Sequence, residues 1–330
     1  MASSRKIVAV FGATGRQGGS VARSLLKNGQ FEVLCVTRNS LSPRAQELQA
    51  LGARVVQGDG SDRTRMCEIL KGTWGAFINN GYTNSPEVRS GRYDLDFGNQ
   101  ALVSAAAAGV KHVVFSSQPS AEDLSNGKIR TPILDIKAYG EKWGRECPQF
   151  VTFTPVMASW YLEDFLMPNF CEGFGGFPWT EDEQGYLTFK SPLIGGNERV
   201  PWISVEDDFG DLVHGIFLNP LRWNKRTVQA AADIVSFSDI VATFVSVTRR
   251  KARFIPLTCS EFPDLDREEM KESRDVFAFY QSRNGEVFGN GITETNTAAE
   301  LKRLAGIAKG AKGKMGLTTC REWFEKHFSK

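Results

Sequence analysis

The sequence has few of the residues from which metal centres and charge-relay sites are built. Its 330 residues include only three histidines, His112, His214 and His327, which lie far apart without the spacing of metal ligands. The six cysteines are scattered, and no two of them form a C-x-x-C pair. A zinc site or a serine–histidine triad would therefore have to be assembled wholly by the fold. We expect no metal, and we expect reduced thiols in a cytosolic or nuclear setting.

The sequence also lacks a strong charge bias and a long apolar run. It has 40 basic and 38 acidic residues, a net charge of +2, which gives no overall attraction to nucleic acids or membranes. The longest apolar stretch, residues 101–110, contains Ser104 and is too short to span a bilayer. Residues 1–6 are too short and too polar for a signal peptide. We therefore expect a cytoplasmic protein that binds neither nucleic acid directly nor a membrane.

What the sequence does contain is a glycine-rich turn near its start. An apolar run over residues 7–11 leads into Gly12, Gly15 and Gly18, and an amphipathic stretch follows as far as Asn28-Gly29. In a strand–turn–helix, glycines allow a dinucleotide phosphate to reach backbone N–H groups that a Cβ would block. The spacing G-x-x-G-x-x-G is not the commonest one, and an ordinary tight turn is the alternative. The position between a strand and a helix favours a cofactor site.

One arginine bears on which dinucleotide is bound. Arg38 lies about 20 residues beyond the glycine turn, where NAD-binding folds carry an acid for the ribose 2′-hydroxyl. A planar guanidinium instead suits a 2′-phosphate, whose oxygens it can bind in pairs. We therefore expect NADP(H) rather than NAD, with a merely solvent-exposed arginine as the alternative.

Strand patterns alternate with helical ones through the first half of the chain. The expected strands cover residues 7–11, 32–38, 53–59, 75–80, 111–117 and 150–155. This alternation predicts an α/β fold with a Rossmann-type, doubly wound parallel sheet. From Met157 the alternation fails, and residues 165–202 are dense in glycine, proline and aromatics. These aromatics could pack a planar ligand or form the core of a second lobe.

These patterns give an expected division of the chain. We predict an NADP-binding Rossmann domain over residues 1–156. We predict that residues 157–330 form mainly a smaller C-terminal α+β substrate lobe. A strand near residues 227–232 is expected to return to the main sheet.

Polar side chains follow several strands at their carboxyl ends, where ligands bind in doubly wound sheets. Asn79 and Asn80 end the fourth strand and are expected to contact a ribose. Asp59 and Asp62 follow the third strand, where one of them could face an adenine ring or cap the next helix.

The segment VFGATGRQGG at residues 10–19 closely resembles the opening of the NmrA-like family. That family consists of atypical short-chain dehydrogenase/reductases related to isoflavone and phenylcoumaran reductases. Further similarities follow in chain order: Thr37-Arg38, Gly58-Asp59, Phe115-Ser116-Ser117, Lys137, Glu163-Asp164-Phe165, and Pro201-Trp202-Ile203-Ser204-Val205 with Asp207. The resemblance covers nearly the whole chain and implies NADP(H) in a cleft between a Rossmann-type domain and a small lobe.

Position and resemblance together give the residues expected at the site. The expected cofactor contacts are Gly12, Thr14, Gly15, Arg16, Gln17, Gly18, Arg38, Asp59, Asn79, Asn80, Ser116, Lys137, Pro155 and Val156. The expected substrate contacts are Gln118, Tyr161, Phe165 and Trp179.

The usual proton donor of short-chain dehydrogenases is missing. Those enzymes place a tyrosine four residues before a lysine, but here Ile133 precedes Lys137 at that spacing and cannot transfer a proton. The isoflavone-reductase relatives resemble this arrangement and use the lysine as the acid/base. Lys137 could do so if burial depresses its pKa, or it could serve only as a ribose ligand.

Two further side chains are candidates for a catalytic role. Tyr161 lies in the segment that the family places beside the nicotinamide, where its hydroxyl could orient or protonate a substrate, or simply pack in the cleft. Ser117 follows the fifth strand and could hydrogen-bond a substrate carbonyl, as could Gln118.

The family resemblance implies two kinds of function. Some members are reductases or dehydrogenases of small molecules, and others are non-catalytic redox sensors that contact transcription regulators. The aromatic-rich segment and Lys137 favour an NADP(H)-dependent oxidoreductase acting on a small, largely apolar organic molecule such as a secondary metabolite. The absent tyrosine favours the sensor, which would require a protein partner and could be nuclear.

Overall fold

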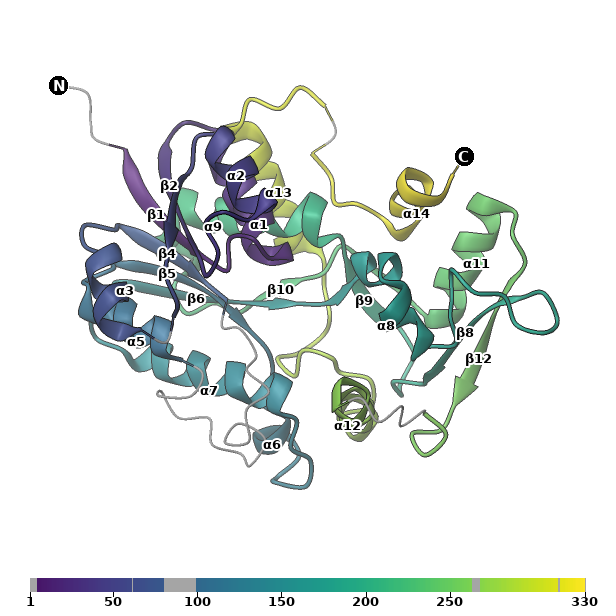
Figure 1. Ribbon diagram of the computed structural model, residues 1–330. Coiled ribbons are helices and arrows are strands. Elements are labelled where there is room, and N and C mark those ends of the chain that lie inside the picture. The colour runs from purple at the N-terminus through teal and green to yellow at the C-terminus, as the bar shows by residue number, and fades with distance from the viewer. Residues whose placement is uncertain (1–4, 61, 80–98, 263–267, 314, 330) are drawn as a thin grey trace.

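A parallel sheet forms the centre of the protein. The computed structural model describes residues 5–60, 62–79, 99–262, 268–313 and 315–329. Its largest sheet has seven strands in the order β10-β6-β5-β4-β1-β2-β3, and every neighbouring pair is parallel (Figure 1). The strands are β1 (Lys6–Phe11), β2 (Phe31–Thr37), β3 (Arg54–Gln57), β4 (Gly75–Ile78), β5 (His112–Ser117), β6 (Thr152–Ala158) and β10 (Val228–Ala230). The strand order reverses at β1, which confirms the doubly wound Rossmann-type fold.

Helices cover both faces of this sheet (Figure 1). On one face lie α1 (Arg16–Leu26), α2 (Pro43–Ala50), α9 (Gly210–Leu218) and α13 (Asn296–Ala308), and on the other α3 (Arg63–Ile69), α5 (Gln100–Ala107) and α7 (Pro132–Glu146). The short helices α6 (Ala121–Leu124) and α10 (Pro220–Trp223) lie in connections. No helix within the described ranges combines the length and the apolar character needed to cross a membrane.

Short-range signals in the sequence set the helix ends. Helix α2 starts with Pro43 in its first turn, and the hydroxyl of Ser42 accepts a hydrogen bond from the Ala45 N–H at 3.3 Å. Just beyond α2, Gly52 has a φ of +98°, which a side chain would strain. The second helix therefore begins at a proline and ends just before a glycine, as these residue types favour.

A second lobe follows the sheet, and it is built around aromatic rings. Its strands are β7 (Trp160–Tyr161), β8 (Leu187–Pro192), β9 (Val200–Ile203), β11 (Asp233–Val235) and β12 (Ala252–Leu257), in a three-stranded sheet β11-β9-β7 and a parallel pair β12-β8. Its helical elements are η1 (Leu162–Leu166), α8 (Pro168–Glu172), α11 (Phe237–Thr248), α12 (Glu268–Ser282) and α14 (Cys320–Phe328). Phe174, Phe177, Phe189 and Trp202 are buried together in this lobe, so most aromatics of residues 165–202 form its core.

The chain beyond Met157 contributes to both lobes. Strand β10 lies beside β6 with Val228 opposite Val156, so it forms one edge of the main sheet. A π-helical turn, η2 (Val205–Phe209), leads into α9, and the Gly210 N–H donates to the Ser20 hydroxyl on α1 at 2.9 Å. A Cβ on Gly210 would lie 2.1 Å from the Ser20 carbonyl oxygen, so α1 and α9 are in close contact. The sheet and the helices around α1 are therefore built from both halves of the chain.

A buried glutamate fixes the start of η2. Glu163 is 4% exposed, and its carboxylate accepts hydrogen bonds from the N–H groups of Val205 and Glu206, each at 3.0 Å. It also accepts from the Ser204 hydroxyl at 2.8 Å. A carboxylate on free N–H groups at a helix start is favourable, so Glu163 joins the second lobe to the helices that cover the sheet.

A buried histidine between α1 and α9 predicts that the fold is sensitive to acid. His214 is fully buried, with Nδ1 3.0 Å from the Ser24 hydroxyl and Nε2 2.7 Å from the Asn28 amide nitrogen. The Ser24 hydroxyl in turn donates to Asp211 at 2.5 Å. This network satisfies a neutral imidazole, and burial lowers the pKa of His214 to about 4.

The expected result is a loss of stability as the pH falls from about 6.5 toward 4. The unfolded chain takes up the proton near a pKa of 6.5, whereas the folded protein does so only near 4, so protonation favours unfolding between these values. We expect a loss of about 3 kcal/mol across that interval, measurable by urea unfolding at several pH values. The His214→Gln protein should lose markedly less stability over the same pH interval. The control is His327→Gln, which replaces a half-buried histidine and should lose about as much stability as the natural protein. An equal loss in all three proteins would contradict the assignment.

Candidate active site

The glycine turn between β1 and α1 has a geometry that only glycine allows. Gly12 has a φ of +60°, and its carbonyl oxygen accepts a hydrogen bond from the Gly15 N–H at 2.8 Å. A Cβ on Gly18 would lie 2.3 Å from that same oxygen and 2.6 Å from the Gly12 carbonyl carbon. The first turn of α1 therefore lies directly against the end of β1 and leaves its backbone open to a ligand.

The start of α1 is suited to an anion. Gly15 is its N-cap residue and provides no side-chain hydrogen bond, whereas α2, α11 and α14 are capped by the side chains of Ser42, Ser236 and Thr319. Uncapped N–H groups and the helix dipole favour negative charge at this position. The buried Oε1 atom of Gln17 also has no hydrogen-bond partner within the described part of the chain. These features fit the diphosphate of a dinucleotide.

Two arginines follow β2 along the chain. Arg38 is exposed immediately beyond β2, and its predicted contact with a 2′-phosphate stays a prediction. Arg44, in the first turn of α2, donates from Nη1 to the Thr14 carbonyl oxygen at 3.1 Å. A polar cavity of about 430 Å³ next to the turn is lined by Thr14, Gly15, Arg16 and Arg44 among others. We did not single out Arg44 from the sequence. A second basic residue in the helix turn that follows Arg38 is the signal that could have shown it.

Lys137 lies at the carboxyl edge of the sheet and is held by three hydrogen bonds. Its Nζ atom, on α7, donates to Asn79 Oδ1 at 2.9 Å, to Ser116 Oγ at 3.1 Å and to the Ser116 carbonyl oxygen at 3.3 Å. Burial lowers the pKa of Lys137 to about 8. The structure thus brings together three residues predicted at the cofactor site, around an amine that can exchange a proton near neutral pH. Asn80 lies outside the described residues.

Two contacts tie the glycine turn to the second lobe. Gln17 donates from Nε2 to the Tyr161 hydroxyl at 2.6 Å, and Arg16 binds the Asp164 carboxylate with an Nη1–Oδ1 distance of 2.5 Å. The Arg16 guanidinium also lies 5.3 Å from the centre of the Tyr161 ring. Burial raises the pKa of Tyr161 to about 12, so its hydroxyl keeps its proton at neutral pH. Burial likewise raises the pKa of Asp164, although Arg16 opposes the effect.

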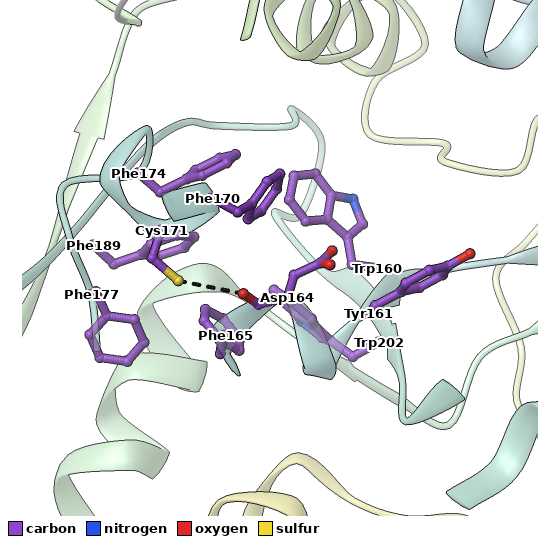
Figure 2. A pocket seen from close by; sticks show the side chains of 10 residues that line it. All are labelled: Trp160, Tyr161, Asp164, Phe165, Phe170, Cys171, Phe174, Phe177, Phe189 and Trp202. Atoms are coloured by element: carbon purple, nitrogen blue, oxygen red, sulfur yellow. Dashed lines mark hydrogen bonds between the residues drawn. The ribbon is translucent and has the colours of Figure 1, made fainter. Parts of the chain in front are cut away.

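An aromatic crevice lies next to these contacts. Figure 2 shows the Asp164 carboxylate on the same side as the indole of Trp160 and the ring of Phe170. The walls also include Tyr161 and buried phenylalanines of the lobe core, and Asp164 is the one charged residue among the described residues that line it. Phe165 forms part of a wall, but it is only 5% exposed and stacks on Trp202 with ring centres 5.5 Å apart. Its expected contact with substrate is therefore mainly a packing role.

Two predicted site residues already have hydrogen-bond partners within the protein. The Ser117 hydroxyl is fully buried and donates to the Glu141 carboxylate on α7, so it is not free to bind a substrate carbonyl. Trp179 is 44% exposed, donates from Nε1 to the Phe165 carbonyl oxygen at 2.8 Å and packs on Phe328. In both cases a partner far along the chain, which local sequence does not reveal, determines the side-chain direction.

The remaining predicted residues lie at the expected edge of the sheet. Gln118 donates from Nε2 to the Ala158 carbonyl oxygen at 3.0 Å, which fixes its amide between β5 and β6. Pro155 and Val156 are buried in β6 opposite Phe115 and Ser116 of β5. Asp59 is exposed just beyond β3. These positions are compatible with the predicted contacts, which stay predictions.

Comparison with known proteins finds one family, both by the family model and by individual relatives. The model of the NmrA-like family matches residues 4–307. The chain is 44% identical over 333 residues to the NmrA-like family domain-containing oxidoreductase lnaB of Aspergillus flavus, with 100% of each chain covered. It is 46% identical over 327 residues to the NmrA-like family domain-containing oxidoreductase himF of Aspergillus japonicus, with 98% of each chain covered.

Solved structures share the fold at lower identity. NmrA, a negative transcriptional regulator crystallised with NADP, has a TM-score of 0.73 and 21% identity, covering 99% of this chain and 96% of its own. The NADPH-dependent quinone oxidoreductase QOR2 of Escherichia coli, crystallised with NADPH, has a TM-score of 0.66 and 17% identity, covering 98% of this chain and 100% of its own. A regulator and an enzyme are thus both built on this architecture, and at these identities the similarity shows the fold alone.

Proposed function

Because the chain belongs to the NmrA-like family, we propose that it is an NADP(H)-dependent oxidoreductase acting on a small, largely apolar organic molecule, such as a secondary metabolite. The two Aspergillus relatives quoted above are named oxidoreductases, and the similarity covers at least 98% of each of them. That name supports the catalytic alternative over the sensor.

One observation carries this proposal: a lysine whose pKa burial lowers to about 8 lies at the carboxyl edge of the sheet. The buried Lys302 is paired with the Asp208 carboxylate, whereas Lys137 donates to the neutral oxygens of Asn79 and Ser116. Here Asn79 and Ser116 hold the amine at the carboxyl ends of the strands, the edge at which ligands bind in doubly wound folds. The bound nicotinamide would supply or accept the hydride.

The other residues of the chain have distinct roles in this proposal. Gly12, Gly15 and Gly18 allow the diphosphate to approach the uncapped start of α1. Lys137 holds the ribose and is the candidate acid or base. We place the substrate beside Tyr161, whose hydroxyl Gln17 holds next to the glycine turn.

The test is transfer of deuterium from the cofactor. The protein would be mixed with NADPH deuterated at the transferable C4 position, in either stereochemical form, and with a small-molecule extract of its source. Mass spectrometry would search for a product that gains one deuterium, and a parallel assay with NADP⁺ would search for NADPH formation. Lys137→Met is the test variant, and Lys142→Met on the exposed face of the same helix is the matched control.

We expect a labelled product with the natural protein and the Lys142 variant, and a much weaker signal with the Lys137 variant. If NADPH binds but neither label transfer nor NADPH formation occurs, the oxidoreductase proposal is overturned in favour of the sensor.

Cofactor choice gives a second check on the site. Arg38→Asp places a negative charge at the end of β2, where a 2′-phosphate would be repelled. Loss of one charge-assisted hydrogen bond, about 1.5–3 kcal/mol, should weaken NADPH binding at least tenfold while NADH binding changes little. Fluorescence titration with both nucleotides measures this, with Arg54→Asp at the exposed start of β3 as the control. An unchanged preference would remove Arg38 from the site.

A further inference from the structure

We propose that Asp164 of the second lobe is a positioning residue for the cofactor: it fixes the Arg16 guanidinium at the start of α1, where the remaining N–H groups of that guanidinium bind the diphosphate. This inference rests on the proposed function for the nucleotide, and it deepens that function by making the second lobe part of the cofactor site. It does not depend on which substrate the protein reduces.

Arg16 occupies a position in its helix that disfavours a cation. It is the first residue of α1, and the N-cap residue Gly15 provides no side-chain hydrogen bond there. The positive end of the helix dipole repels a positive side chain at this position, and residues 16–19 of the sequence contain no acid to offset it. The Arg16 guanidinium therefore needs anions from outside its own helix.

One of those anions comes from the second lobe. Asp164, in η1, binds Arg16 with an Nη1–Oδ1 distance of 2.5 Å, and the two side chains are 23% and 30% exposed. Burial raises the pKa of Asp164, and the charge of Arg16 opposes this effect. Separating the pair would leave a carboxylate of low solvent access without its cation, which costs more than one hydrogen bond to a phosphate returns. We therefore expect Arg16 to stay on Asp164 when a nucleotide binds.

The guanidinium keeps free donors in this arrangement, because it has several N–H groups in a fixed plane. Within the described part of the chain, Asp164 is the one strong acceptor of Arg16. The Nη2 atom lies 3.2 Å from the Met167 sulfur, and a thioether is a weak acceptor. A phosphate oxygen is a much stronger acceptor for such a donor. Arg16 can thus hold the carboxylate and the diphosphate at the same time.

Arg16 also borders a space beside the glycine turn. It lines the polar cavity of about 430 Å³ together with Thr14 and Gly15. Glu206 and Asp207 line the same cavity, so an anion is repelled there unless a cation is held close to it. A freely moving arginine would lose side-chain entropy when a ligand fixed it, whereas the salt bridge to Asp164 already fixes Arg16. Asp164 thus prepares the cation for the diphosphate.

A second contact makes the same connection between the lobes. Gln17, the next residue of α1, is 4% exposed and donates from Nε2 to the Tyr161 hydroxyl at 2.6 Å. The first two residues of α1 are therefore both held by residues 161–164 of the second lobe. Because these side chains lie at the glycine turn, we expect the cofactor affinity to respond to a change in that segment.

The experiment measures nucleotide binding rather than turnover. NADPH and NADH would be titrated by fluorescence into the natural protein, Asp164→Asn, Arg16→Gln and the double variant, with thermal unfolding of each cofactor-free protein in parallel. Both nucleotides carry the diphosphate and only NADPH carries the 2′-phosphate, so the comparison separates the two positions. Glu181→Gln, which removes an exposed acid of the same lobe, is the matched control and should bind both nucleotides normally.

We expect Arg16→Gln to weaken the binding of both nucleotides about tenfold, because a charge-assisted hydrogen bond is lost. Asp164→Asn keeps the shape of the side chain but releases the guanidinium, and it should weaken both about fivefold. The double variant should bind no more weakly than Arg16→Gln, because Asp164 acts through Arg16. A merely structural role of Asp164 would instead persist in the Arg16→Gln background. Asp164→Ser takes the place of the asparagine variant if that protein does not fold.

Unchanged or tighter binding in Asp164→Asn, a loss for NADPH without one for NADH, or a full additional loss in the double variant would each overturn the proposal. This result is separate from the test of the proposed function, because a sensor that transfers no hydride can show the same coupling. An active reductase can equally bind its cofactor without it. The two failures are therefore distinguishable.

Discussion

Replacing Gly18 by alanine is expected to remove NADP(H) binding almost completely. The added methyl would lie 2.3 Å from the Gly12 carbonyl oxygen and 2.8 Å from that of Phe11, and both are backbone atoms that cannot turn aside. Helix α1 must therefore move away from the end of β1, and its first N–H groups leave the position that fits the diphosphate. Losing two charge-assisted hydrogen bonds of about 1.5 kcal/mol each weakens binding roughly a hundredfold.

The measurement is NADPH fluorescence titration, with thermal unfolding of the cofactor-free protein in parallel. The second assay is needed because the same clash also strains the contact between α1 and β1. Gly313→Ala is the matched control, since a Cβ there has no atom within 4 Å. A Gly18→Ala protein that binds NADPH as tightly as the natural protein would show that the cofactor does not lie on this turn.

The second large effect is expected at Lys137. Lys137→Met keeps an unbranched side chain of similar length but removes the donor to Asn79 and Ser116. Removing a charged donor costs about 1.5–3 kcal/mol, so NADPH binding should weaken about tenfold or more. Loss of positioning or of acid/base function should lower kcat/KM about a hundredfold or more. Steady-state kinetics on the product found by deuterium transfer measures both, with Lys142→Met as the control.

The pH profile separates the two roles that remain open for Lys137. If the amine donates a proton, kcat/KM for a carbonyl substrate falls above about pH 8, because burial places its pKa near that value and the ammonium form disappears. If Lys137 only holds the ribose, the profile for the same substrate stays level through this range.

The features that the sequence predicts well depend on neighbours close along the chain. The glycine turn, the start of α2 at Pro43 and the alternation of strands and helices each follow from a few consecutive residues. Lys137 lies at the expected edge because a helix that follows a parallel strand has little freedom in its direction. The family resemblance adds the lobe and the cofactor, and the fold agrees with it.

The features that the sequence does not predict depend on partners far along the chain. Glu163 binds N–H groups about forty residues later, and Arg16 binds Asp164, which lies in the other lobe. Trp179 looks like a ligand contact by composition, but a hydrogen bond to Phe165 and packing on Phe328 hold it elsewhere. Composition identifies the aromatic residues of a lobe and leaves open which of them form its core.

The return of β10 and α9 to the main sheet limits how this protein can be recombined with its relatives. A chimera that joined residues 1–156 of one protein to the remainder of another would replace an edge strand and the helix packed on α1. Such a hybrid would build one hydrophobic core from residues of two different proteins. Exchange of substrate preference should succeed instead when the grafted segments are 160–203, 233–282 and 320–328, and residues 205–230 and α13 stay with the parent sheet. The boundary between the two lobes is therefore a three-dimensional interface that the chain crosses several times, and an exchange of lobes has to follow that interface.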